Sequence, residues 1–174
     1  MRNDFILDEH CLTTQSHSFL EWVKRWAQSR SLWPILVGSG SSATEFHSLF
    51  GSRYDIERLG IDGIKYAPAQ ADLLVITGPV TKKIFPVLKN IYQQMTGPKW
   101  VIALGSDAIN GGIFQNHTLM KNWNIHIPVD VNIPGAPPSP ESIIQGILLI
   151  RERIEKNALS ESSVRKLPNE NFQE

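Results

Sequence analysis

The sequence is almost free of cysteine. Cys11 is the single cysteine in 174 residues, so the chain cannot form an internal disulfide bond or a metal site that needs several thiolates. No segment approaches the run of ~20 apolar residues that a membrane-spanning helix needs. The first ten residues carry acidic side chains where a signal peptide would have an apolar run. We therefore expect a cytoplasmic protein, although it could still dock on a membrane-bound partner.

The chain also lacks an excess of charge of either sign. Lys and Arg together number 17, and so do Asp and Glu. A balanced charge gives no long-range attraction for nucleic acid or for an anionic membrane. The tryptophans are not interleaved with a basic stripe either, so nucleic acid is not an expected partner. The hydrophobic content of 41% and the length suit a single soluble domain with a proper core.

What the sequence does contain is an alternation of strand-like and helix-like segments. Apolar runs closed by Gly or Pro predict buried strands near 35–37, 72–77 and 99–104, with a short, weaker one at 126–131. Helical patterns lie at 16–29, 41–50, 81–94 and 140–154. We expect a serine hydroxyl to cap the second helix, Thr81 to cap the third, and Pro86 to interrupt that third helix early. Pro140 suits the first turn of the last helix.

This alternation predicts an α/β fold, a flavodoxin-like doubly wound parallel sheet in three layers. It has an N-terminal extension (1–15), one domain (16–155) that begins with an amphipathic helix, and a polar, flexible tail (156–174). Ligands of such sheets bind at the carboxyl ends of the strands. The Gly-rich segments 38–45, 104–112 and 133–138 each follow a strand or precede a helix, so we expect them to converge on that edge.

Several motifs in unbroken order carry a family resemblance. Residues 53–60 read Arg-Tyr-Asp-Ile-Glu-Arg-Leu-Gly, residues 68–72 read Pro-Ala-Gln-Ala-Asp, and residues 134–138 read Pro-Gly-Ala-Pro-Pro. With 78–81, 92–95, 98–102 and 128–131, they resemble the small iron–sulfur subunit that respiratory complex I (its 20 kDa or B subunit) shares with membrane-bound nickel–iron hydrogenases of the formate hydrogenlyase type. The resemblance spans roughly residues 30–155. Residues 53–58 and 78–81 look closer to the hydrogenase branch and 41–45 to complex I, so the branch stays open.

The resemblance implies a 4Fe–4S cluster held by four cysteines, and each ligand position has another residue here. Family members have either two adjacent cysteines or a CxxC pair in the first ligand segment. The first two ligand positions fall on Ser41 and Ser42 in the first case, and on Ser39 and Ser42 in the second. The third position falls on Asp107 and the fourth on Ala136. Serine binds iron poorly because its hydroxyl releases a proton far less readily than a thiol. Alanine offers no donor. We therefore expect no cofactor and no metal.

Other chemistry has weaker support. The family usually has an arginine near the cluster where this chain has Ala69. Glu45 and Asp107 could form an acid–base pair, but no motif places a nucleophile or an activating histidine beside them. The histidines lack metal-binding spacing, and residues 38–42 lack the lysine of a phosphate-binding loop. We interpret the remaining charged residues of the motifs as ion pairs and caps. They are Glu45, Arg53, Asp55, Arg58, Asp72 and Asp130.

Two functions follow from the resemblance. In the first, the chain is a non-redox structural or assembly subunit of a complex I-like or hydrogenase-like membrane-associated complex, not an enzyme by itself. It would dock a large-subunit homologue and, indirectly, the membrane arm. In the second, it is an electron-transfer subunit with an atypical iron–sulfur ligand set. Candidate interface residues lie in the N-terminal helix and in the loops. Those of the helix are Phe19, Trp22 and Trp26, for which packing against the sheet is the preferred alternative. Those of the loops are Glu45, Gly111, Gly112, Pro134, Gly135 and Pro137.

Overall fold

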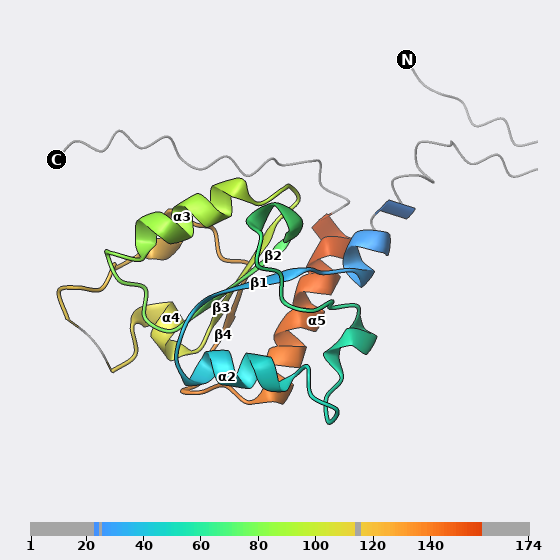
Figure 1. The fold of residues 1–174 in the computed structure, drawn as a ribbon, viewed down its shortest axis with the longest axis horizontal. Coiled ribbons are helices and arrows are strands. Elements are labelled where there is room, and N and C mark those ends of the chain that lie inside the picture. Colours follow the sequence, from blue (N-terminus) through green and yellow to red (C-terminus); the bar gives the residue numbers. More distant parts are fainter. Residues whose placement is uncertain (1–22, 25, 114–115, 158–174) are drawn as a thin grey trace, which may run out of the picture.

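The computed structural model describes residues 23–24, 26–113 and 116–157, and its centre is a parallel four-stranded sheet (Figure 1). The strands are β1 (Pro34–Gly38), β2 (Leu73–Thr77), β3 (Trp100–Leu104) and β4 (Val131–Ile133), in that spatial order. The predictions near 35–37, 72–77 and 99–104 are confirmed. The prediction of a strand at 126–131 was wrong except for Val131. Trp123–Ile125 form the short 3₁₀ helix η3, and Pro128 has no N–H to give to a ladder.

The sheet follows the flavodoxin order once a single bridge beside β1 is counted. Ile61 pairs in parallel with Leu32, on the side of β1 that faces away from β2. The N–H of Leu32 donates to the carbonyl of Gly60 (2.9 Å), and the N–H of Lys65 donates to the carbonyl of Pro34 (2.7 Å). The connection after β1 leads to Ile61 on one side of β1, whereas the connection after β2 leads to β3 on the opposite side. This makes the carboxyl ends of β1 and β2 the topological switch point, where such sheets bind ligands.

Helices cover both faces of the sheet, as predicted. The helices α2 (Ser41–Ser48) and α5 (Pro140–Asn157) pack on one face, and α3 (Phe85–Gln94) with the short α4 (Ser106–Asn110) packs on the other. Side chains of β3 alternate between the two: Ile102 and Leu104 join the first hydrophobic cluster, Val101 and Ala103 the second. Strands buried on both faces read as continuous apolar runs, which is why the sequence pattern predicts them well.

Two helix starts differ from the predictions. Gly40, and not a serine hydroxyl, precedes α2, with φ of 102°, and its carbonyl accepts from the N–H of Ala43 (3.1 Å). The helix α3 starts at Phe85 rather than Thr81, because the backbone of Thr81 pairs with Leu119 in an antiparallel bridge. The hydroxyl of Thr81 caps only a turn, by accepting from the N–H of Ile84 (3.2 Å). Pro86 therefore lies in the first turn of α3, where it interrupts nothing.

The described part of the N-terminal helix, residues 23–24 and 26–30, is more exposed than core packing requires. Trp26 is 54% exposed, so its interpretation as a residue packed against the sheet was wrong; Val23, on the same helix, is 36% exposed. The helix is held at its end, where Arg151 Nε donates to the carbonyl of Ser29 (2.7 Å). Phe19 and Trp22 lie outside the described residues. Within the ranges that the structure describes, no helix has both the length and the apolarity to cross a bilayer.

The charged residues of the motifs mostly serve the fold, as predicted. Arg58 pairs with Asp55. Asp130 is buried, and its Oδ2 accepts from the N–H of Val101 (2.9 Å). Asp72 Oδ1 accepts from the N–H of Trp33 (2.6 Å), which joins the starts of β1 and β2. Burial outweighs that hydrogen bond and raises the pKa of Asp72 to about 6.

Replacing Asp72 by asparagine should make the protein less sensitive to pH. Between the ordinary pKa of 3.8 and the folded value of about 6, the folded protein keeps a proton that the unfolded chain has released. The contribution of Asp72 to stability therefore falls as the pH rises through this window. The amide oxygen of the introduced asparagine can still accept the same hydrogen bond. Urea unfolding at pH 4, 5.5 and 7 measures this effect. Relative to the wild type, the free energy of unfolding of Asp72→Asn should rise by about 1 kcal/mol from pH 4 to pH 7, a value reduced to allow for the partial exposure of Asp72. A constant difference would contradict the assignment.

Candidate functional site

Three loops meet at the carboxyl edge of the sheet, as the sequence predicts. Gly105, between β3 and α4, is the point of contact. Its N–H donates to the carbonyl of Ile133, and the N–H of Ser106 donates to the carbonyl of Gly135, both at 2.8 Å. A Cβ at Gly105 would stand 2.4 Å from Oγ of Ser42, in the first turn of α2. The β1–α2, β3–α4 and β4–α5 connections are thus packed directly against one another.

The β2–α3 loop joins the same edge. Gly78, with φ of +68°, lies so close to the β1–α2 loop that a Cβ there would stand 2.3 Å from the carbonyl oxygen of Ser39. Between these two loops is a small cavity of about 140 Å³ at the switch point. Its walls are mostly apolar. They include Val37, Ile76, Pro79, Val80, Ile84 and Leu88.

The positions at which the resemblance predicts the cluster ligands lie along this edge, but the residues there do not form a ligand set. Ser42 is buried, Asp107 is half-buried on α4, and Ser39, Ser41 and Ala136 are exposed. A 4Fe–4S cluster needs thiolate donors; hydroxyls, one carboxylate and a methyl group do not supply them. Among the residues that the structure describes, no group of three or more His, Cys, Asp or Glu side chains is placed to hold a metal ion. The residues present therefore do not fit the cluster.

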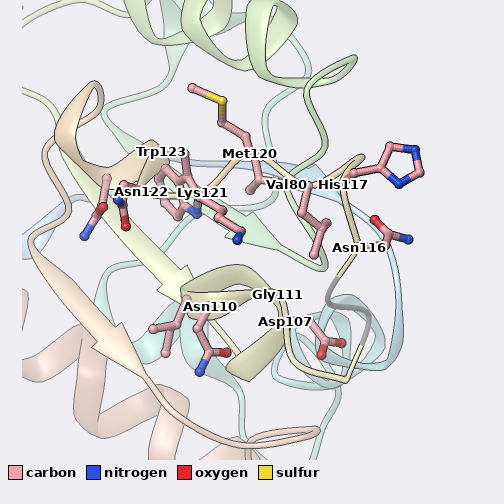
Figure 2. A pocket seen from close by; sticks show the side chains of 13 residues that line it. Val80, Asp107, Asn110, Gly111, Asn116, His117, Met120, Lys121, Asn122 and Trp123 are labelled. Atoms are coloured by element: carbon pink, nitrogen blue, oxygen red, sulfur yellow. The ribbon is translucent and has the colours of Figure 1, made fainter.

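Asp107 has a distinct environment within the edge. A Cβ at Gly112 would meet its Oδ1 at 2.0 Å, so the carboxylate occupies space that only a glycine leaves free. It lines a cavity of about 560 Å³ beside α4, which Figure 2 shows from close by. Glu45 is not among the residues that line this cavity. The structure thus adds nothing to the acid–base pair of Glu45 and Asp107. The cavity itself was not predicted, because its far wall comes from residues 116–124, which carry no recognisable motif.

The candidate interface residues of the loops differ in exposure. Pro134 and Pro137 are exposed, whereas Gly111 is buried and Glu45, Gly112 and Gly135 are half-buried. Gly111 and Gly112 both have positive φ, at +85° and +55°. Gly111 is needed by the packing of this chain, since a Cβ there would lie 2.6 Å from Cδ1 of Leu119.

One polar contact beside the edge was missed from the sequence. Tyr54 donates its hydroxyl hydrogen to Oε1 of Glu141, in the first turn of α5 (2.8 Å), and the guanidinium of Arg53 lies 5.3 Å from the centre of the Tyr54 ring. Hydrogen bonds from its own backbone N–H and from Tyr54 lower the pKa of Glu141, while the hydrogen bond to Glu141 raises the pKa of Tyr54. The acidic residue directly after Pro140 is the signal that could have indicated this contact.

Comparisons with known proteins give the same family as the motifs. The sequence profile of the family described as NADH ubiquinone oxidoreductase, 20 Kd subunit, matches residues 39–150. The B 1 subunit of the NADH-quinone oxidoreductase of Symbiobacterium thermophilum is 45% identical over 146 residues, which cover 83% of this chain and 86% of that protein. The corresponding B subunit of Campylobacter fetus is 40% identical over 142 residues, which cover 82% and 84%.

A solved structure also resembles the chain. A protein chain in the structure of the membrane-bound sulfane sulfur reductase, an archaeal respiratory membrane complex, superposes with a TM-score of 0.72 and has 39% sequence identity. The superposition covers 77% of this chain and 76% of that one. This chain therefore shares both its fold and a large part of its sequence with one solved protein.

The contact between Gly105 and Ser42 can be tested by a pair of substitutions. Gly105→Ala should lower the free energy of unfolding by about 2–4 kcal/mol, because it adds a Cβ at positive φ and against Oγ of Ser42. Adding Ser42→Ala to this variant removes the hydroxyl and should restore part of the loss, while the backbone strain remains. Urea unfolding of both variants and of Ser42→Ala alone gives the coupling. Strictly additive effects would show that the two loops do not touch in this way.

Proposed function

The chain belongs to the family of the 20 kDa subunit of NADH–ubiquinone oxidoreductase, and from this premise we propose that it is a cluster-free structural subunit of a membrane-associated respiratory complex. It has kept the docking edge of the fold and lost the redox centre. Its partner is a homologue of the large subunit of complex I or of a nickel–iron hydrogenase. Contact with the membrane arm is indirect, from the cytoplasmic face.

The donor set at the carboxyl edge carries this proposal. The family's cofactor is a 4Fe–4S cluster, and the matching positions here are serine, aspartate and alanine. One replaced cysteine could be compensated by an oxygen ligand, but Ala136 supplies no donor atom and no thiolate is left at any position. Electron transfer through this edge by a cluster of the family type is therefore not part of the proposed role.

Exposed apolar side chains support the docking part. Ile113, which follows the end of α4, is 89% exposed, and Ile84, beside the cavity at the switch point, is 43% exposed. Pro134 and Pro137 are exposed on the β4–α5 loop. The glycines of the edge are weaker support, because packing within the chain already requires them. A partner that covers this edge would remove this apolar surface from water.

The competing role, electron transfer with an atypical ligand set, makes an opposite prediction about iron. The purified protein should be colourless, and anaerobic reconstitution with iron and sulfide should leave far fewer than the ~4 irons per chain of a 4Fe–4S protein. The B 1 subunit of Symbiobacterium thermophilum, reconstituted in parallel, tests whether the procedure works. About four irons per chain, with broad absorption near ~400 nm, would overturn the cluster-free proposal.

The docking edge can be tested with two exposed alanines at opposite ends of the sheet. Ala136 lies on the β4–α5 loop. Ala69 lies in η2 (Pro68–Gln70), just before β2 and therefore at the amino end of the strands, which corrects the expectation that this position lies near the cluster ligands. Ala136→Glu should reduce co-purification of the large subunit about tenfold or more, because it brings an uncompensated charge into the contact. Ala69→Glu should leave it unchanged. Both variants should unfold at the temperature of the wild type. Normal binding by folded Ala136→Glu would exclude the β4–α5 loop from the interface.

A further inference from the structure

We propose that the cavity beside Asp107 is a socket for a basic side chain of the large subunit, whose cation pairs with the Asp107 carboxylate. This inference rests on the proposed docking function and names the chemistry by which the edge selects its partner. It concerns a cavity that the sequence motifs do not predict, beside the residue at the third predicted ligand position.

The cavity has the size of a ligand site. Its volume is about 560 Å³, within the range of ~300–1,000 Å³ that binding pockets usually have. Three segments build it: Val80 from the β2–α3 loop, residues 107–111 of α4 and its end, and residues 116–124. In Figure 2, Asn116 and His117 lie at one end and Asn122 and Trp123 at the other, with Asp107 below beside Gly111. The lining is mostly polar, so an apolar side chain is not the expected occupant.

Hydrogen bonds fix the walls before any partner binds. The N–H of Met120 donates to the carbonyl of Val80, and the N–H of Lys82 donates to the carbonyl of Thr118, both at 2.9 Å. The buried Trp123 donates its indole N–H to the carbonyl of Ala108 (2.8 Å). These bonds tie the segment 116–124 to the β2–α3 loop and to α4. The socket is therefore built by the fold, and little ordering is left for the moment of binding.

The carboxylate in this socket has no partner within the described chain. Asp107 takes part in neither of two ion pairs of the described chain, which join Arg58 with Asp55 and Lys65 with Asp62. Lys121 also lines the cavity but does not pair with Asp107. Asp107 is half-buried, whereas Lys121 is exposed and stays hydrated. A protein surface that covers the cavity would therefore desolvate the Asp107 carboxylate more than the Lys121 ammonium group.

The desolvation of Asp107 determines which kind of partner side chain can enter the cavity. If a protein surface covers the edge, Asp107 becomes a buried charge, and a buried charge without a counter-ion is strongly unfavourable. A lysine or arginine of the partner removes this cost. Arginine suits the site best, because its planar guanidinium can pair with the carboxylate and also donate to neighbouring amide oxygens. Asn122 and Asn124 line the cavity and can supply such oxygens, whereas the oxygen of Asn110 already accepts from the N–H of Gly112 and that of Asn116 from the N–H of Thr118.

The test measures the affinity of the full chain for the purified large subunit, at low and at high salt. Asp107→Asn keeps the volume and removes the charge; it should weaken binding about tenfold or more at low salt and make the affinity less dependent on salt. Asp107→Glu should bind within a few-fold of the wild type. Glu155→Gln makes the same change of charge at the exposed far end of α5, and should change nothing. Unfolding temperatures show whether each variant is folded.

The possible outcomes separate the two proposals. Wild-type binding with an unaffected Asp107→Asn would overturn the socket and leave the docking function standing. No binding by the wild type would overturn both. Lys121→Met should bind as well as the wild type, or more tightly, because it removes a like charge near the incoming cation. If Lys121→Met loses binding instead, the partner presents an acidic group and the assignment to a basic side chain is wrong.

Discussion

The carboxyl edge of this domain depends on a close approach of backbones at Gly105. Its N–H donates to the carbonyl of Ile133 at the end of β4, the N–H of Ser106 donates to that of Gly135 in the β4–α5 connection, and its missing side chain leaves room for Ser42 of α2. Gly112 does the same for the Asp107 side chain, and Gly135 lies so close to Pro138 that a Cβ would fall 2.3 Å from its Cα. These glycines would be required whether or not a cluster or a partner were present. Their retention is thus a property of the fold, and conclusions about function must rest on the side chains that the edge displays.

The displayed side chains have changed in kind. Thiolates are polarisable anions that share electron density with iron, whereas a serine hydroxyl remains protonated at neutral pH and an alanine methyl group is inert. The loops converge on one place, although the side chains at the predicted ligand positions are not thiolates. Fold and function are separable in this way because the fold is stabilised by two apolar clusters on either side of the sheet, and the ligand positions contribute almost nothing to either cluster.

The sheet could be predicted from the sequence because strands that are buried on both faces consist of continuous apolar residues. The apolar runs at residues 72–77 and 99–104 therefore predict strands without knowledge of tertiary contacts. Prediction from the sequence failed where long-range contacts decide. The start of α3 shifts to Phe85 because Thr81 is held by Leu119, a distant pairing that no local pattern encodes. The cap of α2 is Gly40 because the positive φ of the turn takes precedence over a serine hydroxyl. The positions of the lost ligands came from the resemblance, but the cavity beside Asp107 came only from the structure, since its walls are joined by backbone hydrogen bonds rather than by a motif.

Asp107 is what separates a decayed site from one put to another use. Serine and alanine are passive replacements, and an edge that had merely decayed could hold either at no cost. A half-buried carboxylate, unpaired within the described chain and seated against Gly112, is different, because any surface that covers it must supply a cation or lose affinity. A charge of this kind discriminates between partners by penalising the wrong ones more than it rewards the right one. The edge would then have exchanged a centre that passes electrons between subunits for one that selects which subunit may dock.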